Sequence, residues 1–342
     1  MAMTAATYRS MSIASPGGAL QMAVEEERIP GPEQVRVAVK ACGVCRSDAE
    51  FVTGRWPGIA YPVTPGHEIA GVIEAVGDAV ESWQVGDRVA IGWSGGYCEH
   101  CPRCRRGDFM FCQQNWVTGA SYPGGFAEKV IALHTALARI PDGLSFVAAA
   151  PLACAGVTTF NSLRQAGAGP GDVVAILGLG GLGHLGVQFA TKMGYRTVAI
   201  ARGQDKADLA YQLGAHHYID STAQSVAAEL QKLGGARVVL ATAANVDAMS
   251  ATVDGLSNHG ELVVLAVAPE SLHVTPVQLI ASATTVHGHA SGVGQDIEDT
   301  MSFADLQGIR PIVETMPLVD AAQGYQRMMD NKARFRVVLT AD

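Results

Sequence analysis

The sequence predicts an α/β protein in which a β-rich first part is followed by a doubly wound parallel sheet. In the first part, valines alternate with other residues over positions 35–40, which is the period of a half-buried strand. Beyond residue 154, short apolar strands without alternation are separated by helical segments. That pattern indicates a parallel sheet covered on both faces. A length of 342 residues is typical of about two domains.

The individual elements follow from the same periodicities and from the turns between them. The first part has further short apolar runs, separated by turns rich in Gly and Pro, at residues 69–76, 88–91 and 130–133. In the second part, strands are expected at 172–177, 197–201, 218–219, 238–241 and 262–267. The helices between them are expected at 183–193, 205–213, 222–233 and 245–257. The tail adds helices at 296–306 and 319–329 and a strand at 335–339.

Composition and charge exclude several classes of protein. Hydrophobic residues make up 48% and charged residues 16% of the chain, which is a globular composition. The net charge of −8 argues against a nucleic-acid partner, because such proteins usually present a basic face. The longest apolar runs, 146–157 and 173–183, are too short to span a membrane, and residues 1–18 lack the apolar core of a signal peptide. We therefore expect a soluble cytoplasmic protein.

A glycine-rich loop predicts a dinucleotide site. Residues 178–183 read G-L-G-G-L-G, which fits G-x-G-x-x-G. The motif alone is compatible with an ordinary turn, but here it follows an apolar strand and opens a helix. The first glycine allows the tight turn, the second lets the backbone approach a pyrophosphate, and the third lets the helix pack closely on the strand. The residues assigned to the cofactor are Gly178, Gly180, Gly181, Leu182 and Gly183.

The end of the second strand of this unit bears on which cofactor is bound. NAD sites place an acid there, about 20 residues beyond the first glycine, to bind the ribose 2′-hydroxyl. Ala201 stands at that position, and Arg202 and Lys206 follow it. These two cations suit a 2′-phosphate, so NADP is favoured and NAD stays possible. The alternative is a solvated basic pair, with Asp205 only favouring the start of the helix.

Four of the seven cysteines form a compact cluster. Their spacing is C-x2-C-x2-C-x7-C, and they are Cys98, Cys101, Cys104 and Cys112. Four thiolates in one loop suit a closed tetrahedral zinc site with a structural role. An iron–sulfur cluster is the rival interpretation, but the ferredoxin spacing ends with three residues before a Cys-Pro pair. Here the last gap is seven residues and Gln113 follows, which favours zinc.

Three dispersed segments give the sequence its family resemblance. They contain Cys45, His67 with Glu68, and Cys154, and each is unremarkable when it is read alone. Together with the glycine loop, the four-cysteine loop and residues 334–339, they make the sequence resemble the zinc-dependent alcohol dehydrogenases of the medium-chain dehydrogenase/reductase superfamily. The resemblance implies a GroES-like β-rich catalytic domain at 1–153 and 291–342, and a Rossmann domain at 154–290.

The resemblance also implies a catalytic zinc ion and a set of residue roles. Cys45, His67 and Cys154 would hold this ion, so that each chain binds two zinc ions in all. Asp48 would orient His67, Glu68 would enter the ligand shell transiently, and Ser47 would take the alcohol proton. The residues implied at the cofactor are Arg46, Arg336 and Thr158. Those implied at the substrate pocket are Trp56, Trp93 and Trp116, with Tyr122 a weaker candidate; ordinary core packing is the alternative for these aromatic residues.

The sequence departs from the family at one position in the proton relay. Many members carry a His five residues after the first zinc-binding Cys, whereas this chain carries Glu50. A carboxylate also passes protons, but with a different pH profile. The alternative is a relay that ends at the cofactor ribose and water.

The function implied by the resemblance is reversible hydride transfer between a primary alcohol or aldehyde, aliphatic or aromatic, and a nicotinamide cofactor. The alternatives are a polyol or other dehydrogenase of the superfamily, a zinc-free quinone or enoyl reductase, and a non-catalytic nucleotide-binding protein on the same fold. The expected partners are a small-molecule substrate and further copies of the chain, as a homodimer or homotetramer.

Overall fold

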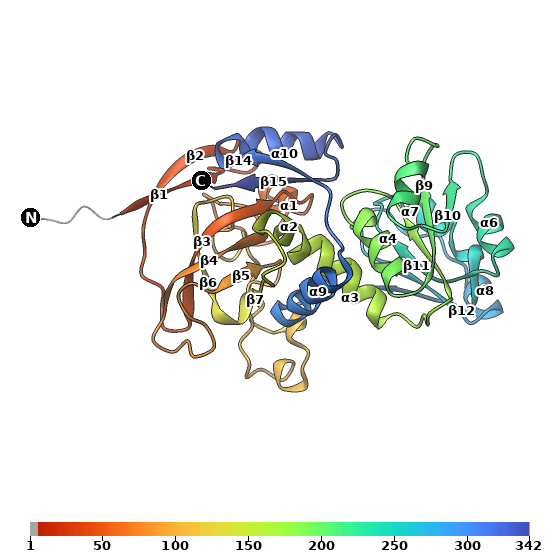
Figure 1. Cartoon of the computed structure of the whole chain (residues 1–342), viewed down its shortest axis with the longest axis horizontal. Coiled ribbons are helices and arrows are strands. Elements are labelled where there is room, and N and C mark those ends of the chain that lie inside the picture. Colours follow the sequence, from red (N-terminus) through yellow and green to blue (C-terminus); the bar gives the residue numbers. More distant parts are fainter. Residues whose placement is uncertain (1–5, 342) are drawn as a thin grey trace, which may run out of the picture. The chain divides into compact units, whose positions relative to one another are not determined.

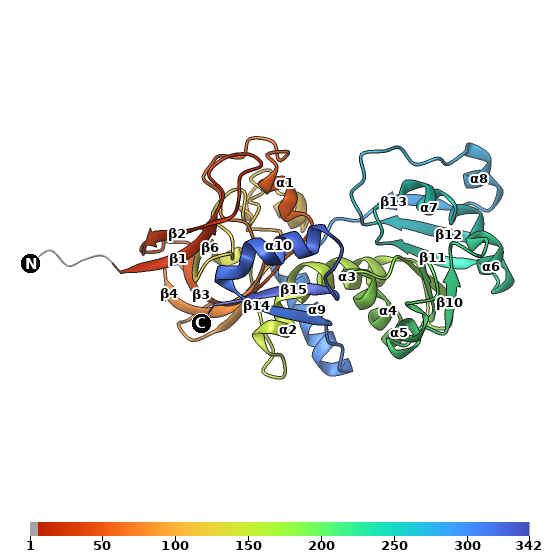
Figure 2. The same ribbon diagram turned by 90° about the horizontal axis from the view of Figure 1, so that it is seen from above.

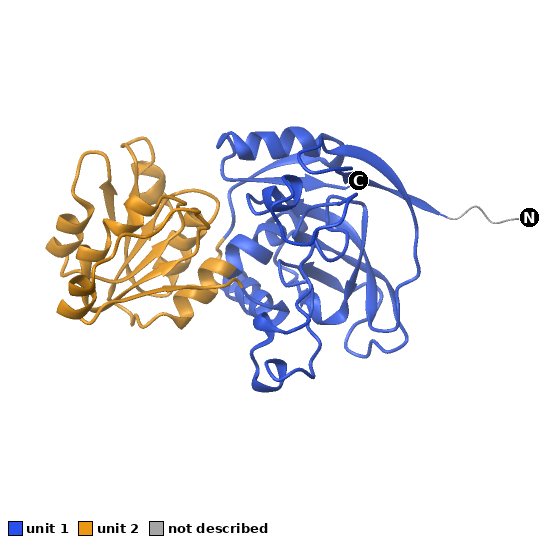
Figure 3. Cartoon of the chain, turned by 180° about the vertical axis from the view of Figure 1, so that it is seen from behind, with its two compact units in different colours: residues 1–157, 292–306, 310–342 blue, residues 158–291, 307–309 orange. Residues whose placement is uncertain are grey.

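The computed structural model of the protein describes residues 6–341. Residues 1–5 lie outside the described residues. They are part of residues 1–18, in which no signal peptide is expected. The chain divides into two compact units. Unit 1 comprises residues 1–157, 292–306 and 310–342, and unit 2 comprises residues 158–291 and 307–309 (Figure 3). The chain therefore passes between the units at residues 157/158 and again at 291/292, and a short tail segment also joins unit 2.

Unit 1 is built on a seven-stranded sheet that is mostly antiparallel. Its order is β14-β15-β3-β4-β5-β7, and β6 pairs with β3. The strands are β3 (Gln34–Gly43), β4 (Glu68–Val76), β5 (Arg88–Ile91), β6 (Lys129–Leu133), β7 (Leu137–Arg139), β14 (Val313–Pro317) and β15 (Arg336–Thr340). The expected alternation holds along β3, where Val35, Val37 and Val39 are buried in the core and the residues between them are partly exposed.

Smaller elements complete unit 1. A two-stranded ribbon is formed by β1 (Thr7–Ser12) and β2 (Gln21–Glu26). The helices of the unit are α1 (Asp48–Val52), α2 (Phe146–Pro151), α9 (Gly294–Gln307) and α10 (Ala321–Met329) (Figure 1). The tail strand β15 pairs with β3, so the sheet of unit 1 combines strands from the first and the last part of the chain.

A long helical segment leads from unit 1 into unit 2. It runs through α2, a π-helical turn at Leu152–Gly156, and α3 (Val157–Gln165). This segment, Phe146–Gln165, is long and apolar enough to cross a membrane by length and composition, but 78% of the apolar window is buried inside the protein. A core helix passes the same test, so this is weak evidence for a membrane span. The sequence prediction stopped at residue 157 because the polar side chains of α3 interrupt the apolar run.

Unit 2 is a six-stranded, entirely parallel sheet. Its order is β10-β9-β8-β11-β12-β13, and the strands are β8 (Val173–Leu177), β9 (Arg196–Ala201), β10 (His217–Asp220), β11 (Ala236–Ala241), β12 (Leu256–Val264) and β13 (Thr285–Gly288). The helices are α4 (Gly183–Lys192), α5 (Ala207–Gln212), α6 (Val226–Lys232), α7 (Val246–Ser250) and α8 (Pro276–Ala281). All five residues of β8 are buried, as a central strand covered on both faces requires. The fold class predicted from the sequence is confirmed.

The strand order places the glycine loop where ligands bind in such sheets. The chain runs outward from β8 through β9 to β10 and then crosses back to β11 on the other side of β8. With right-handed crossovers, this reversal puts α4 and α5 on one face and the later helices on the other (Figure 2). The loop after β8 therefore lies at the topological switch point.

Several details of the sequence prediction were wrong. The helix expected to end at residue 257 ends at Ser250, and β12 already begins at Leu256. Strands β1, β2, β7, β13 and β14 and helices α1, α2, α3 and α8 were missed. Most of these are short, and several lie at sheet edges, where polar residues obscure the apolar pattern.

Candidate active site and metal centres

Four buried side chains of unit 1 converge on one point. They are Cys45, His67, Glu68 and Cys154, and their candidate ligand atoms all lie within 4.8 Å of one another. Cys45 lies between β3 and α1, and His67 and Glu68 lie at the start of β4. Cys154 lies in the π-helical turn, an irregularity that is frequent at functional sites. Three segments that are distant in the chain thus supply one set of sulfur, nitrogen and oxygen donors.

Asp48 fixes the orientation of the His67 ring. Both side chains are fully buried, and His67 Nδ1 donates to Asp48 Oδ1 at 2.8 Å. The same carboxylate accepts from the backbone N–H groups of Cys45, at 2.9 Å, and Gly66, at 3.2 Å. His67 Nε2 is buried and has no hydrogen-bond partner among the described residues. Since an unpaired buried nitrogen is costly, Nε2 fits the role of a metal ligand, and Asp48 that of the group that orients it.

The electrostatics of the site favour a bound cation. Burial by itself lowers the pKa of His67, but the Asp48 carboxylate and the Cys45 thiol outweigh it and raise the pKa well above 6.5. The hydrogen bond from Cys154 is the main cause that lowers the pKa of the Cys45 thiol well below 9.0, in spite of its burial. Surroundings that favour a thiolate at Cys45 and positive charge at His67 also stabilise a bound cation, and Zn²⁺ takes both thiolate and imidazole ligands.

Glu68 and Arg336 form a buried ion pair beside this set. Arg336 Nη2 lies 3.1 Å from Glu68 Oε1, and the two side chains are 5% and 0% exposed. Arg336 Nη1 also donates to the carbonyl of Val44 at 3.2 Å. Burial raises the pKa of Glu68 to about 8, although Arg336 opposes this rise. The guanidinium assigned from the sequence to the cofactor therefore lies behind the metal ligands, against Glu68.

The residues that follow Cys45 lie at the start of α1. Ser47 is the residue before the helix and is partly exposed. Glu50 accepts two hydrogen bonds from Arg55, from Nε at 3.1 Å and from Nη2 at 2.7 Å. Arg46 donates to Asn331 Oδ1 at 3.3 Å. The carboxylate that replaces the family histidine is thus already bound by a guanidinium fork.

Aromatic rings cover one side of the metal set. The rings of Trp93 and His67 meet edge to face with centroids 5.0 Å apart. Trp93 also stacks on Phe51 at 5.4 Å and meets Trp56 edge to face at 5.3 Å. Phe51, which sequence reasoning missed, is fully buried and supports this wall; its only sequence signal is its place three residues after Asp48. An apolar wall of this kind lowers the local dielectric and excludes water.

The other two aromatic candidates take part in local packing. The carbonyl of Trp116 accepts from the backbone N–H of Gly95, at 2.7 Å. Tyr122 donates to the carbonyl of Gly95 at 3.2 Å, and burial raises the pKa of its phenol. Gly95 is two residues from Trp93, so both residues brace the loop that carries that ring.

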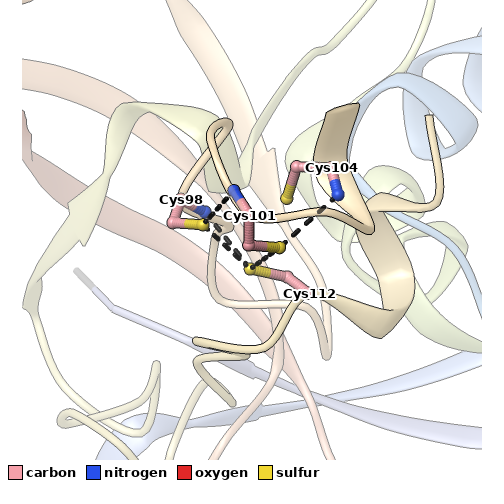
Figure 4. A group of neighbouring side chains, drawn as sticks. All are labelled: Cys98, Cys101, Cys104 and Cys112. Carbon is pink, nitrogen blue, oxygen red and sulfur yellow. Dashed lines mark hydrogen bonds between the residues drawn. The ribbon is translucent and has the colours of Figure 1, made fainter. Parts of the chain in front are cut away.

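The four-cysteine loop forms a second, separate donor set (Figure 4). Cys112 Sγ lies 3.5 Å from Cys98 Sγ and 3.9 Å from Cys101 Sγ. Backbone N–H groups donate to these sulfurs, for example from Cys104 to Cys101 at 3.5 Å and from Gln114 to Cys112 at 3.3 Å. Such bonds, above all from Gln113, lower the pKa of Cys101 to about 6. Four thiols, at least one favoured as thiolate, fit a closed tetrahedral zinc site.

The glycine loop of unit 2 has the backbone geometry that a pyrophosphate site requires. Gly178 has a positive φ of 98°, and a Cβ at Gly183 would lie 1.8 Å from the carbonyl oxygen of Gly178. By contrast, a Cβ at Gly180 would meet nothing within 4 Å, so the loop is open at the point where a phosphate would approach. Gly181 and Leu182 lead directly into α4. The helix N-terminus then supplies N–H groups to an anion.

The basic residues predicted for a 2′-phosphate lie in the turn after β9. Arg202 is exposed, whereas Lys206 reaches back and donates to the carbonyl of Leu179, in the glycine loop, at 3.3 Å. Sequence reasoning missed Tyr218 and Asp220 on the neighbouring strand β10, which hydrogen-bond this turn. Their contacts join residues 15 and 17 positions apart, and no sequence motif marks them.

Thr158, predicted to lie beside the nicotinamide, is held by the end of unit 2. Its hydroxyl donates to Ser291 Oγ at 2.9 Å, and Asn161 Nδ2 donates to the carbonyl of Ser291 at 3.1 Å. The two chain crossings between the units are therefore tied together on the unit 2 side. Ser291 is a further residue that sequence reasoning missed.

Comparisons with known proteins agree with this architecture. Residues 31–142 match the family described as alcohol dehydrogenase GroES-like domain, and residues 181–305 match the family described as zinc-binding dehydrogenase. The chain is 39% identical over 336 residues to the alcohol dehydrogenase notN of an Aspergillus species, which covers 98% of both chains. It is 37% identical over 321 residues to an alcohol dehydrogenase of Geobacillus stearothermophilus, covering 93% of this chain and 95% of the other.

Solved structures extend the similarity to the whole fold. A cinnamyl alcohol dehydrogenase of Sorghum bicolor superposes with a TM-score of 0.89 at 28% identity and 98% coverage of both chains. The chain belongs to the zinc-type alcohol dehydrogenases of the medium-chain dehydrogenase/reductase superfamily, and it is an oxidoreductase that interconverts alcohols and aldehydes.

Proposed function

We propose that the protein catalyses reversible hydride transfer between a primary alcohol, or its aldehyde, and the nicotinamide of NADP, with two zinc ions per chain. The observation that carries the proposal is the convergence of Cys45, His67, Glu68 and Cys154, whose donor atoms lie within 4.8 Å of one another. The unpartnered His67 Nε2 supports a metal there, because no other feature of the described residues satisfies it. The four-cysteine loop supports a second, structural zinc ion.

The chain's own residues hold and shield the catalytic centre. Cys45, His67 and Cys154 would bind Zn²⁺, which supplies a Lewis acid that polarises the substrate oxygen. Asp48 holds the His67 ring through Nδ1, which leaves Nε2 as the nitrogen that would bind the ion. Trp93 lies against that ring and keeps water from one side of it. The buried Arg336 lies against Glu68, so that this carboxyl group has a cationic partner in the interior whenever it is ionised.

The proton of the alcohol leaves through Ser47 in this proposal. A hydroxyl accepts one proton while it gives up another, so it suits an internal position in a relay. Glu50 lies one helical turn further along α1, where its side chain accepts two hydrogen bonds from Arg55. Glu50 is thus the proposed acceptor at the end of the relay. The alternative end is the cofactor ribose and water.

The cofactor preference rests on the turn after β9. Ala201 offers no carboxylate to a ribose 2′-hydroxyl, whereas Arg202 and Lys206 bring two cations near the glycine loop. A charge-assisted hydrogen bond is worth roughly 1.5–3 kcal/mol, which corresponds to about a 10- to 100-fold preference for NADPH. The pair Ala201→Asp with Arg202→Ala should reverse this preference. A wild-type enzyme with a higher kcat/KM for NADH than for NADPH would remove this part of the proposal.

The substrate class follows from the wall beside the metal ligands. Trp56 and Trp93 present apolar rings, which suit aliphatic or aromatic alcohols and aldehydes better than sugars. A polyol dehydrogenase is therefore the less favoured member of the class. A zinc-free reductase or a non-catalytic protein would not need the buried donor set. The proposed setting is a cytoplasmic homodimer or homotetramer that acts on small molecules, with no nucleic-acid or membrane partner.

The decisive experiment combines metal analysis with a turnover screen. Purified protein should contain about two zinc ions, reduce a panel of aldehydes, and use NADPH faster than NADH. Cys45→Ala should retain one zinc ion and lose turnover while its fold is kept. Cys42→Ala, which removes a buried thiol that belongs to neither donor set, serves as the control and should keep both ions. A fully active Cys45→Ala variant would show that the catalytic centre is misassigned.

A further inference from the structure

The turn that carries Arg202 is held in place from the neighbouring strand. Strands β9 and β10 pair in parallel, with Ala201 directly opposite Asp220 (Figure 1). The backbone N–H of Ser221 donates to the carbonyl of Ala201 at 2.9 Å, which continues the pairing past the end of β9. Arg202 is the next residue, so the position of its backbone is fixed on one side by the last pairing of the sheet.

Gly203 is bound on both of its peptide groups by side chains of β10. Its N–H donates to Asp220 Oδ1 at 2.8 Å, and its carbonyl accepts from the Tyr218 hydroxyl at 2.6 Å. Gly203 has a positive φ of 75°, a conformation that an L-residue adopts only with strain. The two hydrogen bonds therefore fix a turn that the backbone alone would not hold rigidly.

Asp220 is an acid at the end of β10, opposite Ala201, but its oxygens are already used. Besides Gly203, Oδ1 accepts from the Thr222 N–H at 2.9 Å and from the Thr222 hydroxyl at 2.7 Å. Oδ2 lies 3.4 Å from the side-chain amide of Gln204. The Thr222 hydroxyl is the main cause that lowers the pKa of Asp220, so the group stays an acceptor at neutral pH. Asp220 is 4% exposed and faces protein donors.

We infer that Tyr218 and Asp220 are positioning residues for cofactor specificity: they hold the turn at Gly203 so that Arg202 is presented to the 2′-phosphate of NADP. This inference rests on the NADP preference proposed above. Pre-organisation matters here because a mobile turn would lose backbone entropy when Arg202 binds a phosphate, and a turn that is already fixed avoids this loss. Neither residue is assigned any contact with the cofactor.

The test uses two adenosine fragments that differ only in the 2′-phosphate. Adenosine 2′,5′-bisphosphate and adenosine 5′-monophosphate are titrated into the holoenzyme by calorimetry, so that no turnover is needed. The wild type should bind the bisphosphate more tightly. Tyr218→Phe should weaken the bisphosphate about 3- to 10-fold, the equivalent of one net hydrogen bond, and leave the monophosphate unchanged. Tyr211→Phe, on the exposed surface of α5, is the matched control and should change neither affinity.

A double-mutant cycle separates positioning from a general loss of structure. In an Arg202→Ala background the wild-type preference should largely disappear, and Tyr218→Phe should then cause little further loss. Gly203→Ala disturbs the same turn without touching β10, and it should weaken the bisphosphate selectively even if Tyr218→Phe folds poorly.

The outcomes distinguish the inference from the proposal on which it rests. If the wild type prefers the bisphosphate but Tyr218→Phe and Gly203→Ala keep the full preference, the positioning role is wrong and the NADP proposal stands. Equal losses for both fragments, or additive losses in the cycle, also overturn the inference. If the wild type binds both fragments equally, the phosphate clamp itself is wrong, and the inference is rejected with it.

Discussion

At the scale of single residues, two buried carboxyl groups, those of Asp48 and Glu68, belong to the candidate metal centre. Asp48 accepts three hydrogen bonds, from His67, Cys45 and Gly66, and thereby links two of the three segments that carry candidate ligands. Glu68 is accommodated because its partner across β3 and β4 is Gly43, where a Cβ would lie 1.9 Å from Glu68 Oε2. The chemistry and the packing of this site therefore constrain the same few positions.

Ser47→Ala should slow alcohol oxidation about 10²- to 10⁴-fold, the usual contribution of general acid–base assistance. The change removes the first group of the proposed relay but no ligand, so the zinc content should stay the same. Steady-state kinetics with elemental analysis measures both quantities, and Ser47→Thr, which keeps a hydroxyl, should recover most of the rate. A loss below about threefold would mean that the proton passes directly to water.

Arg336→Met should destabilise the protein by less than the roughly 3–5 kcal/mol that breaking a buried ion pair usually costs, because Glu68 can give up its charge. The pKa of Glu68, already about 8, should rise further without the guanidinium, and protonation then limits the cost. Urea denaturation at pH 7.5 measures the loss. Combining the change with Glu68→Gln should restore part of the stability, and an Arg336→Met variant as stable as the wild type would contradict the role given to the pair.

At the scale of elements, the loop 98–112 has almost no core of its own. Its buried members are three of the four cysteines, with Tyr97, Cys98 and Phe109 packed around them. In the proposed enzyme the second zinc ion holds this segment, because so few apolar contacts cannot offset the entropy of ordering a loop.

Cys101→Ala should therefore lower the melting temperature by several degrees while the catalytic zinc ion stays bound. The expected metal content is about one ion per chain, with kcat for a fresh sample close to that of the wild type. Calorimetry and elemental analysis on the same preparation test this. Cys42→Ala is a suitable control, since that buried thiol belongs to neither donor set. Loss of both ions from Cys101→Ala would mean that the two sites are not independent.

An ion pair between Arg9 of strand β1 and Glu128 stabilises this strand, and its contribution depends on pH. Glu128 accepts from the backbone N–H of Arg9 at 2.6 Å and from its Nε at 2.7 Å. Burial alone raises the pKa of Glu128, but the bonds from Arg9 outweigh it and the pKa lies below 4.5. A carboxyl group with a lowered folded-state pKa stabilises the fold above its unfolded pKa, and this contribution is lost as the pH falls through the folded-state pKa.

Glu128→Gln should accordingly be less stable than the wild type at pH 7, by about 0.5–1 kcal/mol. The difference should shrink as the pH is lowered below about 4.5 and the wild-type carboxylate is protonated. Thermal melts of both proteins across this range give the comparison, with the exposed Glu81→Gln as control. A difference that is independent of pH would show that the carboxylate charge does not matter.

At the scale of the whole molecule, each unit has a hydrophobic core of its own. One cluster gathers strand residues of unit 1 such as Val37, Ile69 and Val89, and another gathers those of unit 2, such as Ile200, Val239 and Leu262. Metal donors belong to unit 1 and the glycine loop belongs to unit 2. Because local stability follows local packing, ligands of the two kinds should protect different parts of the chain.

Amide hydrogen exchange should reveal this division. Removal of zinc by a chelator should raise exchange in residues 43–68 and 98–112, and exchange in β8, β9 and β11 should change little. Adding NADPH should lower exchange in residues 178–183 and 202–206. A chelator that raises exchange equally in both units would contradict independent cores.

How much could be predicted from the sequence differs with the range of the interactions. The four-cysteine loop and the glycine loop were predicted from spacing, since their members are neighbours in the chain and the chemistry is local. The central strands of unit 2 were predicted because burial on both faces makes them uniformly apolar, whereas the edge strand β13 was missed because its residues are partly exposed. Cys45, His67 and Cys154 could be joined only through the family resemblance.

By itself, the sequence determined the fold class, the two candidate ligand-binding loops and, through resemblance, the family. Only the tertiary structure decided which side chains meet: Phe51 behind Trp93, Arg336 against Glu68, and Tyr218 with Asp220 on the turn at Gly203. The physical reason is that periodicity and spacing record the burial and backbone needs of neighbouring residues. Contacts between distant segments depend on strand register and close packing, and no local pattern in the chain encodes them.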